Sequence, residues 1–156
     1  MKTTRNFREY KVWQDAVAFA SEVYKVTAEM PWFEKKGLCD QLQRAVVSIS
    51  SNIAEGAARP SDADFAHFLD TALGSAYEVE TQLLIAKNVG YINDNEGRRT
   101  IDDNDRRRTI DDRRRTKDDR RRTMDDDGAI SFEKLLSDIQ DIEKQLAIFI
   151  SFIRKK

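Results

Sequence analysis

The chain has 156 residues, a mass of 18.0 kDa and a formal net charge of −1 at pH 7, which suits one domain with its own hydrophobic core. The near-neutral balance excludes the strongly basic global field of many nucleic-acid-binding proteins, so any such site must be a local patch. The single cysteine, Cys39, excludes an internal disulfide framework and fits a reducing compartment.

Composition favours long helices. Hydrophobic residues make up 40% of the chain and charged residues 35%, with only two prolines and six glycines, which is unlike a turn-rich β fold. No apolar run approaches the roughly 20 residues that a membrane span needs, and the opening MKTTRNFREYKVWQD lacks the apolar stretch of a secretory signal. We therefore expect a cytoplasmic protein without a membrane partner.

The first predicted helix covers residues 10–29, where apolar and aromatic side chains recur at spacings of three and four until Pro31 ends the pattern. Its predicted core stripe consists of Tyr10, Trp13, Val17, Ala20, Tyr24 and Thr27. In the loop that follows, 31–36, we expect Trp32 and Phe33 to fold over the end of the helices.

Two further helices are predicted over 37–58 and 61–90, on either side of Arg59-Pro60. Ser61 is a suitable N-cap for the second of them, and Gly90 stands where a C-terminal cap belongs. The apolar stripe of the first comprises Leu38, Leu42, Ala45, Ile49 and Ile53, and that of the second comprises Phe65, Phe68, Leu69, Ala72, Ala76, Val79 and Leu83.

A fourth helix is predicted to start at Ser131 and to end in a basic tail that suits the negative end of a helix dipole. Its apolar residues alternate by three and four, the period of a helical bundle: Phe132, Leu135, Ile139, Ile142, Leu146, Phe149 and Ile153. Four such helices predict an all-α fold, an antiparallel up-down-up-down four-helix bundle that occupies residues 1–156 as a single domain.

Between the third and fourth helices, residues 97–128 form a low-complexity Arg/Asp insert. RRRTIDD, RRRTKDD and RRRTMDD follow one another with a period of seven from Arg106. Residues 98–127 hold eleven Arg and one Lys against ten Asp, a local balance of +2. The insert has too few apolar residues to fold on its own, and lengthening a surface loop costs only about 0.6 kcal/mol per doubling. We interpret it as a tolerated duplication in an exposed loop; the alternative is a functional basic arm.

Both middle helices carry a second patterned face, on the side away from the core stripe. Gly74 is its most informative member, because a mid-helix glycine costs about 1 kcal/mol relative to alanine and usually marks a close backbone approach. We predict an oligomer interface made of Arg44, Ser48, Asn52, Glu55, Gly74, Ser75 and Glu78. The alternative is an ordinary solvated face with one tolerated glycine.

Glu80 lies at the margin of the predicted core, where a carboxylate needs a partner because an unpaired buried charge is costly. The sequence suggests Arg44 as that partner.

The sequence offers few residues from which a catalytic or metal site could be built. His67 is the only histidine, so any triad would depend on it, and neither zinc nor di-iron ligand sets can be assembled. Cys39 stands at the start of a helix, where the dipole could lower its pKa, but a packed thiol is the stronger interpretation. A small helical ribonuclease would need Arg followed by four to six residues and His; seven residues separate Arg59 from His67. We expect no enzyme activity, no cofactor and no metal.

The pattern GLxxQxxRAxxSIxxNIAEG from Gly37 to Gly56, followed by FxxFLxxAxGSxxExE from Phe65 to Glu80 and IAxxxGYI, resembles a known family. That family comprises the bacterial four-helix-bundle proteins encoded in intervening sequences of 23S ribosomal RNA genes. The opening FREYKVWQDA is similar to the family's N-terminal motif. The resemblance covers about residues 7–93 and 129–153; the Arg/Asp insert departs from it.

The resemblance implies a homopentameric ring of bundles without established enzymatic activity. Related accessory proteins of diversity-generating retroelements are similar pentamers that bind nucleic acid and a reverse transcriptase. We therefore predict a homo-oligomeric, non-enzymatic scaffold that binds RNA or DNA, with a nucleic-acid-processing protein as a further candidate partner. The alternatives are a protein–protein adaptor without nucleic-acid binding and, more remotely, the ribonuclease. The candidate phosphate contacts are Lys11, Lys35, Lys36, Arg59, Lys87, Arg154, Lys155 and Lys156.

Overall fold

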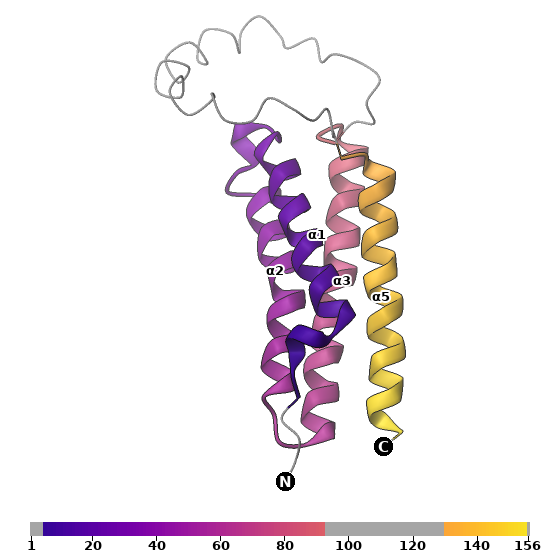
Figure 1. The fold of residues 1–156 in the computed structure, drawn as a ribbon. Coiled ribbons are helices and arrows are strands. Elements are labelled where there is room, and N and C mark those ends of the chain that lie inside the picture. Colours follow the sequence, from indigo (N-terminus) through magenta and orange to yellow (C-terminus); the bar gives the residue numbers. More distant parts are fainter. Residues whose placement is uncertain (1–4, 93–129, 156) are drawn as a thin grey trace, which may run out of the picture. The chain divides into compact units, whose positions relative to one another are not determined.

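Four long α-helices make up most of the computed structural model, which describes residues 5–92 and 130–155. The prediction made for the insert 97–128 lies outside these residues. The helices are α1 (Lys11–Ala28), α2 (Leu38–Ala57), α3 (Asp62–Asn88) and α5 (Phe132–Arg154), and two 3-10 turns, η1 (Phe7–Glu9) and η2 (Trp32–Glu34), precede α1 and α2 (Figure 1). The described part of the chain contains no strand, so the predicted all-α class is confirmed.

The four helices lie side by side, each packed against two others. Helix α1 contacts α2 and α5, and α3 contacts the same two helices. Successive helices run in opposite directions (Figure 1), an arrangement consistent with the predicted up-down-up-down bundle. None of the described helices is long and apolar enough to cross a membrane.

Local capping signals set the helix ends where the sequence predicts them. The Ser61 hydroxyl accepts a hydrogen bond from the Asp64 backbone N–H at 3.0 Å, and the Ser131 hydroxyl accepts one from Lys134 N–H at 3.2 Å. Each satisfies one of the donors left open in the first turn. Beyond the end of α3, Gly90 adopts a φ of +77°, a left-handed conformation that favours glycine.

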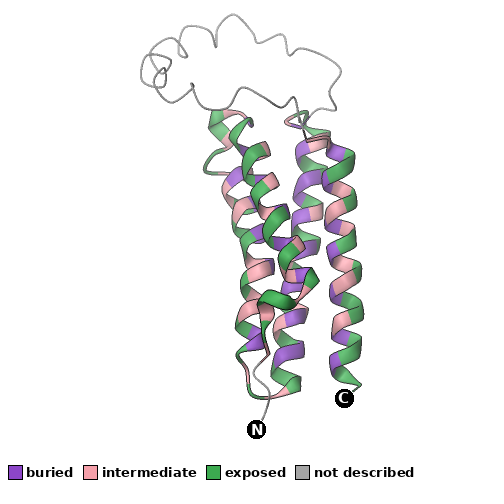
Figure 2. Ribbon diagram, viewed as in Figure 1, coloured by how far each residue is buried: buried purple, intermediate pink, exposed green. Residues whose placement is uncertain are grey.

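The core is formed by stripes on all four helices (Figure 2). The predicted stripes of α2, α3 and α5 are confirmed, except that Leu38, Phe68 and Phe149 are only half-buried. Tyr10, Phe65 and Phe149 form an aromatic cluster within this core, with ring centroids 5.0–6.1 Å apart.

The predicted stripe of α1 is confirmed only in part: Thr27 is buried, and Tyr10, Trp13 and Ala20 are half-buried against the core. The buried residues are Val12, Ala16, Phe19, Val23 and Thr27, of which only Thr27 was predicted. Val17 and Tyr24 remain 39% and 47% exposed. The prediction followed the large aromatic side chains, but tyrosine and tryptophan suit the margin of a core, where their polar atoms reach water. A second, smaller set at the same helical spacing faces α2 and α5 instead.

Candidate subunit interface and basic residues

The seven predicted interface residues lie along the outer side of α2 and α3, and we call this surface the α2–α3 face. Ser48, Asn52 and Ser75 are half-buried where the two helices meet, while Arg44, Glu55, Gly74 and Glu78 are exposed. The Ser48 and Ser75 hydroxyl oxygens are 3.0 Å apart. The two polar stripes therefore meet within one chain, a contact that was not predicted.

A chain of hydrogen bonds crosses this junction. The Asn52 side-chain amide donates to the Ser48 carbonyl and hydroxyl oxygens at 2.8 and 2.9 Å. The Ser75 hydroxyl donates to the Thr71 carbonyl at 3.0 Å. Because each hydroxyl has a single proton, Ser48 must donate to Ser75. These residues consequently join α2 to α3 within one subunit, whatever else they contact.

The charged members of the face have partners on their own helices. Arg44 pairs with Asp40, and Glu55 pairs with Arg59, both at i,i+4 spacing. Such exposed pairs stabilise a helix by only about 0.3–0.5 kcal/mol, so a neighbouring chain could replace either partner at little cost.

Gly74 has no contact that explains it within the subunit. A Cβ atom built on it would meet no heavy atom within 4 Å. The close backbone approach inside the bundle occurs at Gly56 on α2, where an added Cβ would lie 2.6 Å from the Phe68 Cβ and 2.9 Å from the Phe65 ring. Glycine at position 74 therefore lowers the stability of the helix, and no close packing within the single chain requires it.

The predicted Arg44–Glu80 pair is wrong. The Glu80 carboxylate accepts a hydrogen bond from the Gln140 side-chain amide of α5 at 2.8 Å, whereas Arg44 is engaged by Asp40. Glu80 lies on the side of α3 that faces α5, whereas Arg44 belongs to α2. Helix periodicity alone does not show which neighbouring helix the Glu80 side chain reaches.

Glu143 is a functional candidate that the sequence analysis missed. It lies on α5, its Oε1 atom is buried without a hydrogen-bond partner, and burial together with the nearby Glu80 charge raises its pKa to about 7. Glu143 directly follows the core residue Ile142, and this position in the sequence could have indicated a carboxylate at the edge of the core. A carboxyl group that is buried beside a like charge favours its protonated form.

We expect the stability of the bundle to fall as the pH rises from about 5 to about 8 through Glu143, because the folded state binds this proton more tightly than the unfolded state. Glu143→Gln, which mimics the protonated acid, should remove that part of the decline. The variant should match the parent chain near pH 5 and exceed its free energy of unfolding by roughly 1 kcal/mol near pH 8, after allowance for partial exposure. Urea titrations at both pH values measure this difference. Parallel pH profiles for the two proteins would contradict it.

The predicted phosphate contacts do not form one surface. Lys35 and Lys36 follow η2, and Lys87 lies in the last turn of α3, all at one end of the bundle. The others with described positions lie toward the opposite end, on or beside the ends of three helices: Lys11, Arg59, Arg154 and Lys155. Helix α3 has 27 residues, so the two groups are separated by about 40 Å. Lys156 lies outside the described residues.

Several of these cations are already paired with carboxylates. Lys11 pairs with Asp15, Arg59 with Glu55, and Arg154 with Asp70. The Arg59 guanidinium also stacks on the Phe68 ring, 4.5 Å from its centroid. Lys35 and Lys36 are exposed, which makes the end of the bundle that carries η2 the better candidate for a phosphate contact.

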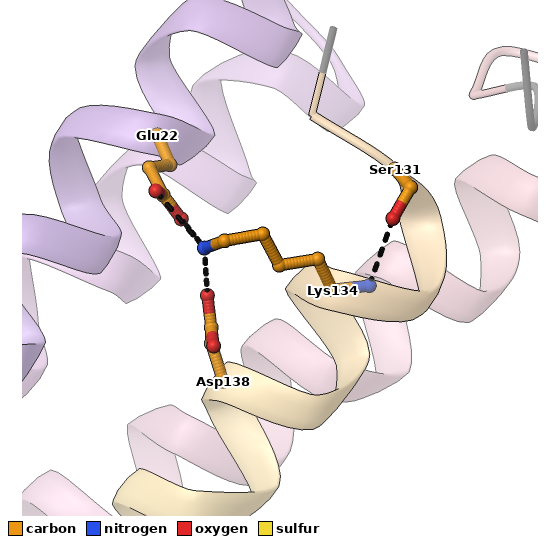
Figure 3. A network of polar contacts seen from close by, with 4 residues as sticks. All are labelled: Glu22, Ser131, Lys134 and Asp138. Atoms are coloured by element: carbon orange, nitrogen blue, oxygen red, sulfur yellow. Dashed lines mark hydrogen bonds and ion pairs between the residues drawn. The ribbon is translucent and has the colours of Figure 1, made fainter. Parts of the chain in front are cut away.

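A polar groove of about 370 Å³ runs between α1 and α5. Lys134 of α5 donates to both carboxylate oxygens of Glu22 on α1, at 3.0 and 3.1 Å, and to Asp138 (Figure 3). These hydrogen bonds raise the pKa of Lys134, and the bond to Asp138 has the largest effect. The groove is also lined by Asp15 and Asp141. Its carboxylates outnumber its lysines, so it does not suit a phosphate backbone.

Nucleophilic catalysis would depend on Cys39 and His67. The Cys39 side chain is buried with its Sγ 3.3 Å from the Met30 Sδ, and burial, followed by the Glu34 charge, raises the pKa of the thiol. The interpretation as a packed thiol is confirmed. His67 is exposed on α3, beside the Phe68 ring. Across residues 5–92 and 130–155, no three Cys, His, Asp or Glu side chains are placed to hold a metal ion.

Comparison with known proteins supports the resemblance. The model of the family described as 23S rRNA-intervening sequence protein matches residues 8–110. Among solved structures, a protein of unknown function from the S23 ribosomal protein family of Bacteroides thetaiotaomicron VPI-5482 is similar, with a TM-score of 0.61 at 22% identity, over 90% of this chain and 95% of that one. At that identity the similarity concerns the fold. The search of curated proteins gave no match.

Proposed function

The chain belongs to the family of 23S rRNA-intervening sequence proteins, and from this premise we propose that it is a cytoplasmic, non-enzymatic homo-oligomer, a pentamer, that binds RNA or DNA as a scaffold. The observation that carries the self-association is the α2–α3 face. One of its residues, Gly74, is exposed, and a Cβ atom built on it would meet no atom of another helix within 4 Å. A second helix could approach this position more closely than at any residue with a side chain.

Self-association also compensates for the weak charge of a single subunit. One chain carries a net charge of −1, and the candidate phosphate contacts with described positions are divided between the two ends of the bundle. A ring of copies would repeat each basic end around a rim, and repeated weak contacts to one strand raise the overall affinity without any strongly basic subunit.

A salt titration tests the nucleic-acid function. We expect the assembled protein to retain structured RNA or duplex DNA on a filter, with an affinity that falls at least tenfold between about 50 mM and about 200 mM salt as phosphate contacts are lost. Serum albumin, an acidic protein, is the control for adventitious retention. An affinity that stays constant across this range would contradict phosphate recognition.

A protein–protein adaptor is the second candidate. It is favoured by the ion pairs of Lys11, Arg59 and Arg154, because a phosphate would have to displace a carboxylate at each. An assembled particle that retains neither RNA nor DNA at low salt would support the adaptor and contradict the nucleic-acid scaffold.

A further inference from the structure

Two large aromatic side chains project into solvent at the end of the bundle where α2 begins. Trp32 and Phe33, both on η2, are 59% and 58% exposed. The prediction that these rings fold over the helix ends is wrong, because more than half of each side chain remains exposed. A buried aromatic ring of this size contributes about 1.5–3 kcal/mol, so adjacent rings left in water mark a surface that a partner covers.

The turn that carries these rings is held in place by the rest of the bundle. The Trp32 and Phe33 rings meet edge to face with centroids 6.1 Å apart, and Phe33 meets Tyr91 in the same manner at 6.1 Å. Lys35 N–H donates to the Trp32 carbonyl at 3.3 Å. The rings are therefore positioned in advance, which lowers the entropy lost when a ligand binds.

The only carboxylate within the turn is used for structure. One Glu34 oxygen accepts a hydrogen bond from the Tyr91 hydroxyl at 3.0 Å, and the other accepts one from Leu38 N–H at 3.2 Å, at the first residue of α2. Its negative charge lies at the positive end of that helix. Gly37 leaves room for it, since a Cβ there would lie 2.7 Å from the Glu34 carboxylate.

Two exposed lysines follow the rings directly in the chain, Lys35 and Lys36. Exposed aromatic faces beside cations match the chemistry of an unpaired nucleotide, whose base stacks and whose phosphate is anionic. A duplex presents phosphates but keeps its bases inside the stack, so it could use the lysines and not the rings. A neutral apolar peptide could use the rings and not the lysines.

We propose that Trp32, Phe33, Lys35 and Lys36 form a stacking platform for single-stranded nucleic acid. The inference rests on the proposed function and narrows it: the preferred ligand is single-stranded, and it binds at the end of the bundle where α2 begins. Bases stack on the two rings, and the neighbouring phosphates contact the two lysines.

Tryptophan fluorescence can report this contact directly, because the chain contains only two tryptophans, Trp13 and Trp32. Trp13 packs edge to face against Phe7 at 5.1 Å, so Trp13→Phe in the full chain keeps an aromatic ring there and leaves Trp32 as the sole tryptophan. We expect an oligouridylate of about 12 nucleotides to quench its emission with the same midpoint as filter binding. A duplex of the same length should cause much less quenching.

Substitutions then separate stacking from charge. Trp32→Ala should weaken oligouridylate binding about tenfold or more, since one base–aromatic stack contributes about 1–3 kcal/mol, and should leave duplex binding unchanged. Trp32→Phe should restore most of the affinity. Because the ring is exposed, the circular dichroism and melting temperature of Trp32→Ala should stay close to those of the parent chain.

The following results would contradict the proposed stacking platform. Retention of oligouridylate with unquenched Trp32, or equal quenching by the duplex, would reject it while the proposed function stands. Failure of any nucleic acid to bind would reject both. A Trp32→Ala protein of smaller assembled mass would show that the rings contact a second copy of the chain instead.

Discussion

We expect Gly74→Leu to convert the assembled protein into a folded single chain of about 18.0 kDa. The side chain fits the isolated subunit, because no heavy atom lies within 4 Å of the Cβ position. In the proposed assembly, the same position packs against a second helix, and extra methyl and methylene groups there cost about 1–3 kcal/mol at every contact. Light scattering coupled to size-exclusion chromatography measures the mass.

Ala147→Leu provides the matched control, since it adds similar bulk to an exposed position of α5 outside the α2–α3 face. It should leave the mass unchanged. Circular dichroism should show both variants with the helix content of the parent chain, and Gly74→Leu should gain up to about 1 kcal/mol of intrinsic helix stability. A parent chain that runs as a monomer, or a Gly74→Leu variant with the parent's assembled mass, would refute the proposed interface.

The second glycine should behave in the opposite way. We expect Gly56→Ala to lower the free energy of unfolding by about 1–3 kcal/mol, although alanine by itself favours a helix by about 1 kcal/mol over glycine. The added Cβ would lie 2.6 Å from the Phe68 Cβ and 2.9 Å from the buried Phe65 ring. The Phe68 Cβ is bonded directly to the helix backbone and the Phe65 ring is fully buried, so α3 itself would have to move away from α2. Chemical denaturation measures the loss.

Val47→Ala is a suitable control for Gly56→Ala, because Val47 is an exposed α2 residue and the change improves helix propensity without a clash. It should leave the free energy of unfolding close to that of the parent chain. A Gly56→Ala protein as stable as the parent would mean that α2 and α3 can separate at this crossing without cost. The two glycines together distinguish packing within a subunit from packing between subunits.

The α2–α3 face was only partly predictable. A helical wheel places Ser48 and Asn52 on one side of α2, and Gly74 and Ser75 on the outer side of α3, because helix periodicity is local. That the two serines touch depends on the crossing of the helices. Which basic residues lie together depends on the antiparallel packing of the helices, because this packing decides which helix ends meet. It put Lys36 and Lys87 at one end and Arg59 and Arg154 at the other.

Local patterns determined the helical class, the core stripes of α2, α3 and α5, and the caps at Ser61, Ser131 and Gly90. Periodic burial and first-turn hydrogen bonds involve residues only a few positions apart, so one sequence suffices to recognise them. Tertiary structure decided which side of α1 is buried, that Gln140 and not Arg44 meets Glu80, that Gly56 marks the tight crossing, and that Trp32 faces water. Each of these outcomes depends on which distant element lies opposite a side chain, and helix periodicity carries no information about that neighbour.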